Sequence, residues 1–510
     1  MIKRLLILLI LLIAVPCWGA NIYIDPTAGS GGDGSFATPY DSWTDVDLSV
    51  SNNYRQLCGT TYTGTITVTA TGTSGDHVII GAYYDDGGVV HEDDSPNFGQ
   101  LCGNSAQKPI IKQTLGSGVL ITTATSASSQ YLEINSLQLK DADTAIRSDA
   151  NYNFIRYCYL YNLYWGIRVG LATAGHYNTI EYNYIDLNTA VAGDNDTVDA
   201  IKLQSYSSNC TVQYNHLTGF DHTGILLSYS DDNTIQYNYI FGSGVEAEQE
   251  CIAHNFNADR NIIRYNYCND AGLAHQILGG NDNEIYGNIY SCDGASRPAL
   301  DQGCIHLQSS VTVAYSSSNN KFYNNTVYDN DNATGGHGVM LYAHSTNNSD
   351  VSDNEFYNNI FLKVNGRCIY VLDDNGVIGT NYFYNNACYD FPENQYSYIE
   401  GTSDTTAVNF NAGFAIAIDN RGTWNGSPGL SSPSTGEFWP ASSASDVYET
   451  GYNVGDPYDT LLLSTSNFTA SPPSVQTQQF ATDYIGAYGL VGAATPLYPI
   501  QGAAGNFKYN

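Results

Sequence analysis

The amino-acid sequence predicts an all-β solenoid, a coil of short stacked parallel strands. Eight residues recur almost unchanged as NTIEYNYI (178–185), NTIQYNYI (233–240) and NIIRYNYC (261–268). Short runs rich in Val, Ile, Thr and Tyr alternate with Asn, Asp and Gly, which is the chemistry of strands and turns. Repeats of this kind are typical of a solenoid in which each unit packs only on its neighbours.

An asparagine column runs through the repeats at intervals of 22 to 37 residues. Its ten members are Asn135, Cys158, Asn183, Asn215, Asn238, Asn266, Asn288, Asn325, Asn359 and Asn386. A buried amide must be hydrogen-bonded, and identical asparagines on adjacent coils can satisfy one another. Asparagine also tolerates the left-handed backbone of a tight turn. The column therefore predicts the turn at which each coil changes direction, with the adjacent tyrosines forming aromatic stacks.

The ends of the chain differ from the repeats. Lys3 and Arg4 precede the apolar run 5–15 and the segment 16–20, which together predict a signal peptide over residues 1–20. We expect an N-terminal cap with the first coils at 21–115, the repeat domain at 116–400 and a C-terminal capping region at 401–510 that covers the open end of the coil. The protein is expected to be secreted or extracellular, including the cell surface or periplasm.

The charge of the chain limits its possible partners, and its cysteines bear on disulfides. Fifty acidic and eighteen basic residues give a net charge of −32, which argues against nucleic acid and anionic membrane surfaces as partners. No stretch after the signal reaches the roughly 20 apolar residues of a membrane span, so we expect no membrane insertion. An exported chain can form disulfides, and Cys58 with Cys102 is the preferred pair.

The repeats resemble the right-handed parallel β-helix superfamily, the pectate-lyase-like fold, over residues 120 to 390. The opening segment Asn21–Pro26 and the segment DYIGAY at 483–488 are similar to the two ends of many secreted β-helix proteins. The resemblance implies a right-handed single-stranded parallel β-helix of about 10 or more coils with a C-terminal cap.

A basic stripe is predicted along the second strand of the repeat, which has the form small-Ile-x-apolar, as in Gly166–Val169 and Ala200–Leu203. Because side chains alternate along a strand, the x residues point outward. They are Arg147, Arg168, Lys202, Leu226, Ala253, Ala274, His306, Met340 and Tyr370. The three basic side chains on neighbouring coils repel unless nearby carboxylates or a polyanionic ligand neutralise them.

The insertions in the repeat gather before this strand, at 190–199, 244–250, 292–302 and 331–337. Insertions on one face of a solenoid usually mark its working face. Trp165 lies in the equivalent short turn and would either stack on a sugar or fill the core. We expect Arg147, Trp165, Gln204 and His306 to bind substrate, and the ligand to be an acidic polysaccharide.

Many members of the superfamily cleave acidic polysaccharides by β-elimination. The segment DAIKLQS at 199–205 resembles a strand of some pectate lyases. This resemblance implies a polysaccharide lyase in which Lys202 is the base and Arg168, with Arg147, holds the uronate carboxylates. Asp196, Asp199 and Glu250 would offer the hard oxygen ligands that Ca²⁺ prefers.

Two other functions remain open from the sequence. Asp199 and Asp221, one coil apart, could form the carboxylate pair of a glycoside hydrolase. The scaffold could also serve as a non-catalytic carbohydrate-binding, adhesion or surface structural protein. His254 and His275 fall on inward positions, where we expect core residues instead of catalytic ones.

Overall fold

The computed structural model describes most of the chain up to residue 404 and short strands beyond it. The described ranges are 19–93, 101–123, 130–173, 175–187, 198–242, 249–269, 271–292, 302–309, 315–328, 336–344, 350–362, 367–374, 377–384, 386–389, 397–399 and 402–404, with strands at 416–419, 430–432, 437–440, 460–462 and 475–477. Residues 1–18 of the predicted signal, Asp196 and most of the predicted C-terminal cap lie outside these ranges.

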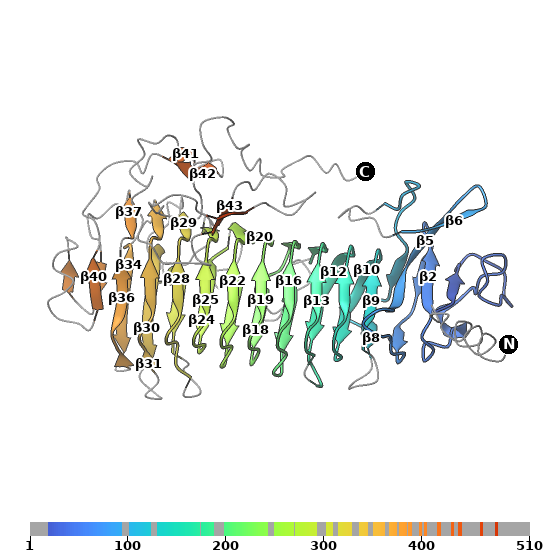
Figure 1. Ribbon diagram of the computed structural model, residues 1–510, viewed down its shortest axis with the longest axis horizontal. Coiled ribbons are helices and arrows are strands. Elements are labelled where there is room, and N and C mark those ends of the chain that lie inside the picture. The colour runs from blue at the N-terminus through green and yellow to red at the C-terminus, as the bar shows by residue number, and fades with distance from the viewer. Residues whose placement is uncertain are drawn as a thin grey trace, which may run out of the picture.

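The first sheet runs along the long axis of the molecule, with its strands following one another from the N-terminal to the C-terminal end (Figure 1). Its order is β1 (Asn21–Ile24), β2 (Asn53–Leu57), β5 (Val78–Asp86), β9 (Leu132–Asn135), β11 (Phe154–Arg156), β13 (Thr179–Glu181), β16 (Thr211–Gln213), β19 (Thr234–Gln236), β22 (Ile262–Arg264), β25 (Glu284–Tyr286), β28 (Lys321–Tyr323), β32 (Glu355–Tyr357), β36 (Asn381–Tyr384) and β40 (Ile416–Asp419). These neighbours pair in parallel, and β6 (Val89–Glu92) adds an antiparallel partner to β5.

A second sheet follows the asparagine turn. It contains β3 (Thr61–Thr63), β7 (Ile110–Lys112), β10 (Gln138–Ser148), β12 (Tyr159–Val169), β14 (Tyr184–Asp186), β17 (His216–Thr218), β20 (Tyr239–Phe241), β23 (Tyr267–Asn269), β26 (Ile289–Ser291), β29 (Thr326–Tyr328), β33 (Ile360–Leu362) and β37 (Ala387–Tyr389). Each strand pairs in parallel with its counterpart one coil further on.

A third sheet carries the predicted basic stripe. It contains β4 (Ile66–Val68), β8 (Val119–Thr123), the second halves of β10 and β12, β15 (Ile201–Gln204), β18 (Thr223–Ser228), β21 (Glu250–Asn255), β24 (Leu273–Leu278), β27 (Gln302–Gln308), β30 (Gly336–His344), β34 (Ile369–Asp374) and β38 (Ser397–Ile399). The long strands β10 and β12 bend from the second sheet into the third. The predicted parallel β-helix is therefore confirmed.

The remaining described elements are small. One 3-10 turn, η1 (Trp43–Asp45), lies near the N-terminal end. Short pairs are formed by β31 (Asp350–Val351) with β35 (Val377–Ile378), β38 with β39 (Thr402–Asp404), β41 (Leu430–Ser432) with β42 (Glu437–Pro440), and β43 (Thr460–Leu462) with β44 (Val475–Thr477). Among the described residues no helix is long and apolar enough to cross a membrane.

The core is a stack of inward columns of branched aliphatic side chains. In the first sheet the fully buried column contains Ile134, Ile155, Ile180, Val212, Ile235, Ile263 and Ile285. Such β-branched residues fit closely on a pleated surface, and their removal from water is the main term that stabilises the coil.

The asparagine column is confirmed as a hydrogen-bonded ladder. From Asn183 to Asn359, each side-chain amide donates to the carbonyl oxygen of the next asparagine at 2.9–3.0 Å. The same oxygen accepts the backbone N–H of the preceding asparagine, as between Asn238 and Asn266. Each buried amide is thus satisfied by its neighbours along the coil axis.

Two details of this turn differ from the prediction. The left-handed residue is the tyrosine before the asparagine, for example Tyr237 and Tyr265 with φ of 57° and 56°, whose rings stack at 5.3 Å. The first position of the ladder belongs to Leu137, because Asn135 instead pairs with Arg156 in the first sheet. The alignment missed this because the unit from 135 to 158 follows a different local register.

A second asparagine ladder was not predicted, although its members begin the repeated segments NTIQYNYI and NIIRYNYC. Amide-to-carbonyl bonds of 2.9–3.1 Å connect Asn233, Asn261, Asn283, Asn320, Asn354 and Asn381. Free Cys158 and Cys210 are buried and each occupies an asparagine position, one in each ladder. The two ladders lie before and after the strands of the first sheet. Polar contacts between coils therefore fix both ends of these strands.

Disulfides join cysteines that lie 12 to 44 residues apart in the sequence. The predicted pair Cys58–Cys102 is confirmed. Two further disulfides, Cys251–Cys268 and Cys292–Cys304, were not predicted. Cross-links of this kind stabilise mainly by restricting the unfolded chain.

We predict that the folded state loses stability in acid, because two histidines are buried in the core. His254 and His275 are fully buried with stacked rings 5.1 Å apart, as the strand periodicity predicted. Burial lowers the pKa of His254 from 6.5 to about 4, so the folded state binds fewer protons than the unfolded chain. This histidine contributes stability that is present above pH 6.5 and is lost as the pH falls toward about 4.

Denaturant unfolding of the wild type and of His254→Leu across this pH window measures the effect. The wild type should lose about 2–3 kcal/mol of unfolding free energy from this single site. The variant should lose correspondingly less. An identical pH dependence in both proteins would contradict the prediction.

Candidate functional site

The basic stripe is in register on three neighbouring coils of the third sheet. Arg147 pairs with Arg168, and Arg168 pairs with Lys202, on β10, β12 and β15. The outward column continues through Leu226, Ala253, Gln276, His306, Met340 and Tyr370. Gln276 replaces the predicted Ala274, because His275 aligns with Ile252 and shifts β24 by two residues relative to the sequence pattern.

Carboxylates neutralise two of the three basic residues. Arg147 Nε lies 2.6 Å from Asp149 Oδ2, and Lys202 Nζ lies 3.4 Å from Asp199 Oδ2. Among the described residues no carboxylate lies within ion-pair distance of Arg168, and its buried Nε makes no hydrogen bond. Burial lowers the pKa of Arg168, whereas the charges of Asp143 and Asp199 act in the opposite direction. Local carboxylates therefore explain the stripe only in part, and Arg168 is the cation that can accept an external anion.

Trp165 lies beside the stripe. Its half-buried ring has the Arg168 guanidinium carbon 4.2 Å from the centroid and Lys202 Nζ 5.0 Å from the centroid. These cation–π contacts hold both side chains against the aromatic face. The ring is thus half-buried against the stripe and is not one of the buried core residues.

Polar side chains from three coils meet next to Lys202. His222 Nδ1 is 2.6 Å from Asp199 Oδ1, and His222 Nε2 is 3.8 Å from Glu250 Oε2. Thr223 Oγ1 donates to Glu250 Oε2 at 2.6 Å. Burial opposes the charged form of His222, but the hydrogen bond with Asp199 and the charge of Glu250 raise its pKa to about 9. His222 therefore holds a proton at neutral pH.

Asp221 completes this group with a carboxyl of different acidity. Burial raises the pKa of Asp221 to about 6, and the charge of Asp199 also favours its protonated form. Its Oδ1 accepts the backbone N–H of Val198 at 3.2 Å. We refer to the five residues Asp199, Lys202, Asp221, His222 and Glu250 as the Asp199 cluster. The sequence indicated Asp221 only as half of a carboxylate pair and missed His222, which follows it directly.

The described residues do not fit the predicted calcium ion. Asp196 lies outside them, and they contain no group of three or more His, Cys, Asp or Glu side chains that could hold a metal. Asp199 already contacts Lys202 and His222, so a cation at this carboxylate would have to displace two positive groups. We therefore derive no chemical step through calcium.

The other predicted site residues lie apart from the cluster or beside it. Gln204 follows Lys202 on the same strand with 9% of its surface exposed. His306 lies four coils from Lys202 along the outward column, roughly 19 Å at the usual strand spacing. It is 5% exposed, and burial lowers its pKa to about 4. The structure does not bring His306 to the Asp199 cluster.

Comparisons with known proteins agree with the architecture. The family model described as a right handed beta helix region matches residues 117–290. This match agrees with the right-handed parallel β-helix that the strand order shows. No curated protein matches the sequence.

Among solved structures, the catalytic domain of a GH87 α-1,3-glucanase is 14% identical with a TM-score of 0.50, covering 73% of this chain and 64% of that domain. Pectate lyase Pel9A is 13% identical with a TM-score of 0.46, covering 92% and 97%. A PL6 family polysaccharide lyase from Pseudopedobacter saltans is 13% identical with a TM-score of 0.49, covering 79% and 92%. At 14% identity, the likeness to the glucanase domain concerns the fold alone.

Proposed function

We propose that the protein binds an acidic polysaccharide along the basic stripe and cleaves it at the Asp199 cluster. Arg168 is the observation that carries this proposal. It is held on Trp165 between two cations that are paired with carboxylates, and among the described residues no carboxylate comes within ion-pair distance of it. A uronate carboxylate would supply the missing partner, and a charged hydrogen bond to guanidinium is among the strongest available.

β-Elimination is the first candidate reaction. Arg168 would pair with the uronate carboxylate and make the adjacent C5 proton more acidic. Lys202, in its neutral form, would take this proton, and His222 would donate its own to the departing glycosidic oxygen. The C5–H and C4–O bonds break while the C4=C5 double bond forms.

Hydrolysis is the second candidate, and Asp221 is the observation that favours it. A carboxyl with a pKa of about 6 lies one coil from Asp199, which pairs with His222 and Lys202. An acid and a base in unlike environments are the arrangement that glycoside hydrolysis requires. Asp221 would protonate the leaving oxygen, and Asp199 would activate water.

One assay separates the two reactions. The purified protein is incubated with polyuronates, glycosaminoglycans and a neutral glucan, while ultraviolet absorbance of unsaturated products and released reducing ends are both followed. Elimination raises both signals and hydrolysis raises reducing ends alone. If neither rises, the proposal of cleavage fails for these polymers, and retention of the protein on an immobilised polyuronate would indicate a binding protein.

Hydrolysis predicts a specific response to Asp221→Asn. The loss of the acid should lower the rate about 100-fold or more, and wild-type activity should fall as the pH rises above about 6, where Asp221 loses its proton. Initial rates across the pH range test both statements. Asp232→Asn, which removes an exposed carboxylate paired with Arg260, should change neither. Unchanged activity in Asp221→Asn would exclude Asp221 as the acid.

A further inference from the structure

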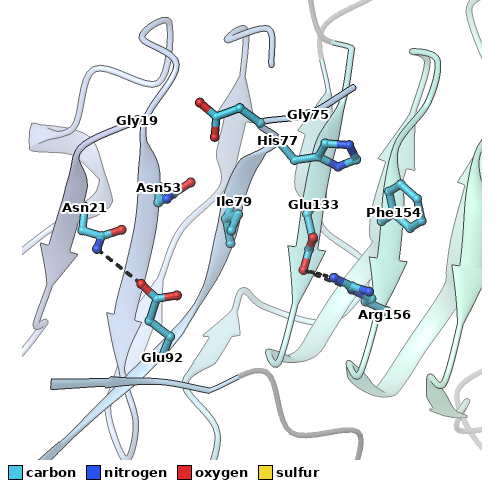
Figure 2. A pocket seen from close by; sticks show the side chains of 11 residues that line it. Gly19, Asn21, Asn53, Gly75, His77, Ile79, Glu92, Glu133, Phe154 and Arg156 are labelled. Atoms are coloured by element: carbon cyan, nitrogen blue, oxygen red, sulfur yellow. Dashed lines mark hydrogen bonds and ion pairs between the residues drawn. The ribbon is translucent and has the colours of Figure 1, made fainter. Parts of the chain in front are cut away.

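A separate pocket of about 480 Å³ lies at the N-terminal end, on the outward side of the first sheet (Figure 2). Its lining includes Asn53, His77, Glu92, Glu133, Phe154 and Arg156. These residues come from or adjoin β2, β5, β6, β9 and β11, whereas the Asp199 cluster is built mainly on the third sheet. The volume is within the range of small-molecule sites, roughly 300–1,000 Å³.

Most charged groups of this pocket are already paired, Glu133 with Arg156 and Glu92 with the neighbouring Arg55, and Asp76 adds a further carboxylate to the lining. Arg156 donates from Nε and Nη2 to Glu133 Oε1 at 3.0 and 2.8 Å. Glu92 accepts from Arg55 Nη2 at 2.7 Å and from Asn21 Nδ2 at 3.3 Å, and Figure 2 shows the Asn21–Glu92 and Glu133–Arg156 contacts. Because these pairs are fixed and Asp76 adds a negative charge to the wall, the pocket does not favour an anionic ligand.

Two polar atoms in the wall have no partner among the described residues. Asn53 Oδ1 and His77 Nδ1 are buried and make no hydrogen bond. Burial lowers the pKa of His77, so its ring is neutral and Nδ1 can donate or accept. Unpaired buried polar atoms are rare and cost about 1–3 kcal/mol each. A hydroxyl group can satisfy either atom, since it donates and accepts.

An aromatic wall lies at the His77 end of the pocket. The His77 and Phe154 rings are 5.1 Å apart and tilted by 42°, and Figure 2 shows them side by side at one end of the pocket. Phe154 is half-buried and pairs with Glu133 across adjacent strands. The carbon-bound hydrogens of a sugar ring pack well on such an apolar face, while its hydroxyl groups meet the polar wall.

We infer that this pocket is a non-catalytic binding site for a neutral sugar unit. The unpaired atoms of Asn53 and His77 would bind its hydroxyl groups, and Phe154 would stack on its ring. Because the pocket lies on another face than the Asp199 cluster, it would anchor the protein to a neutral glycan or to a neutral stretch of a mixed one. This inference does not depend on the proposed cleavage.

Calorimetric titration of the full chain with cellobiose, maltose, lactose and nigerose, and with digalacturonate for comparison, tests the site. At least one neutral disaccharide should bind. Phe154→Ala and the more conservative His77→Gln should each weaken binding about tenfold or more, which corresponds to the loss of one good contact. Thr211→Ala, two coils further along the outward column of Phe154, should leave it unchanged.

Lys202→Met should also bind normally, which separates this site from the Asp199 cluster. Melting temperatures of the variants show whether a loss of binding reflects unfolding, and His77→Gln keeps the test valid if Phe154→Ala is unstable. The inference is overturned if no neutral disaccharide binds, if both pocket variants bind as the wild type does, or if digalacturonate binds this pocket more tightly.

Discussion

Replacing Lys202 with methionine is expected to lower the rate of elimination about 1,000-fold, within the range that a positioned general base contributes. The substitution removes Nζ, which lies 3.4 Å from Asp199 and 5.0 Å from the Trp165 ring centroid, but keeps an unbranched stem that can cover the same aromatic face. Asp199 keeps its hydrogen bond with His222. The loss should therefore appear in kcat at an unchanged melting temperature.

Lys140→Met is a closely matched control. Lys140 also pairs with a carboxylate at 3.4 Å, that of Asp141, and its Nζ lies 5.1 Å from the centroid of the Tyr161 ring. Its removal should leave the rate of unsaturated-product formation unchanged. Full elimination activity in Lys202→Met, or an equal loss in Lys140→Met, would show that Lys202 is not the base. A loss of reducing-end release without any unsaturated product would instead place Lys202 in a hydrolytic site.

The sequence predicts much of this fold because a solenoid repeats its local rules. The period-two pattern places Ile201 inward and Lys202 outward, and the same rule places His254 and His275 inside. The register between coils is harder to predict from the sequence, since it depends on which backbone groups pair. This explains why Ala274 and Asn135 were each misplaced by two residues, a shift that keeps the alternation and leaves the sequence pattern almost unchanged.

The candidate site is predicted only in outline. The stripe of Arg147, Arg168 and Lys202 follows from the repeat, but its neutralisation depends on side-chain directions that the repeat does not encode. His222 contacts Asp199 across a coil boundary and gains its positive charge from that contact. Neighbouring acidic residues in the sequence could equally have formed a metal site. Only the positions of the nitrogen atoms around Asp199 distinguish the two arrangements.

Replacing Asn266 with alanine is expected to lower the free energy of unfolding by about 3–5 kcal/mol, because several buried groups lose their partners together. The Asn266 amide donates to Ile235 O at 2.9 Å and to Asn288 Oδ1 at 3.0 Å. Its carbonyl oxygen accepts both the backbone N–H and the side-chain amide of Asn238 at 3.0 Å. Alanine makes none of these bonds and leaves a cavity between two coils.

Denaturant unfolding measures the loss of global stability, and hydrogen exchange of the Asn238 amide measures local opening of its coil. Asn104→Ala is the control, since Asn104 is exposed and accepts one bond, from the backbone N–H of Ala106 at 3.0 Å. It should cost less than about 1 kcal/mol. Fast exchange at Asn238 with a small global loss would mean that the coils open separately, as nearest-neighbour coupling in a solenoid allows. Equal losses in both variants, with Asn238 still protected, would show that the ladder satisfies polar groups without stabilising the coil.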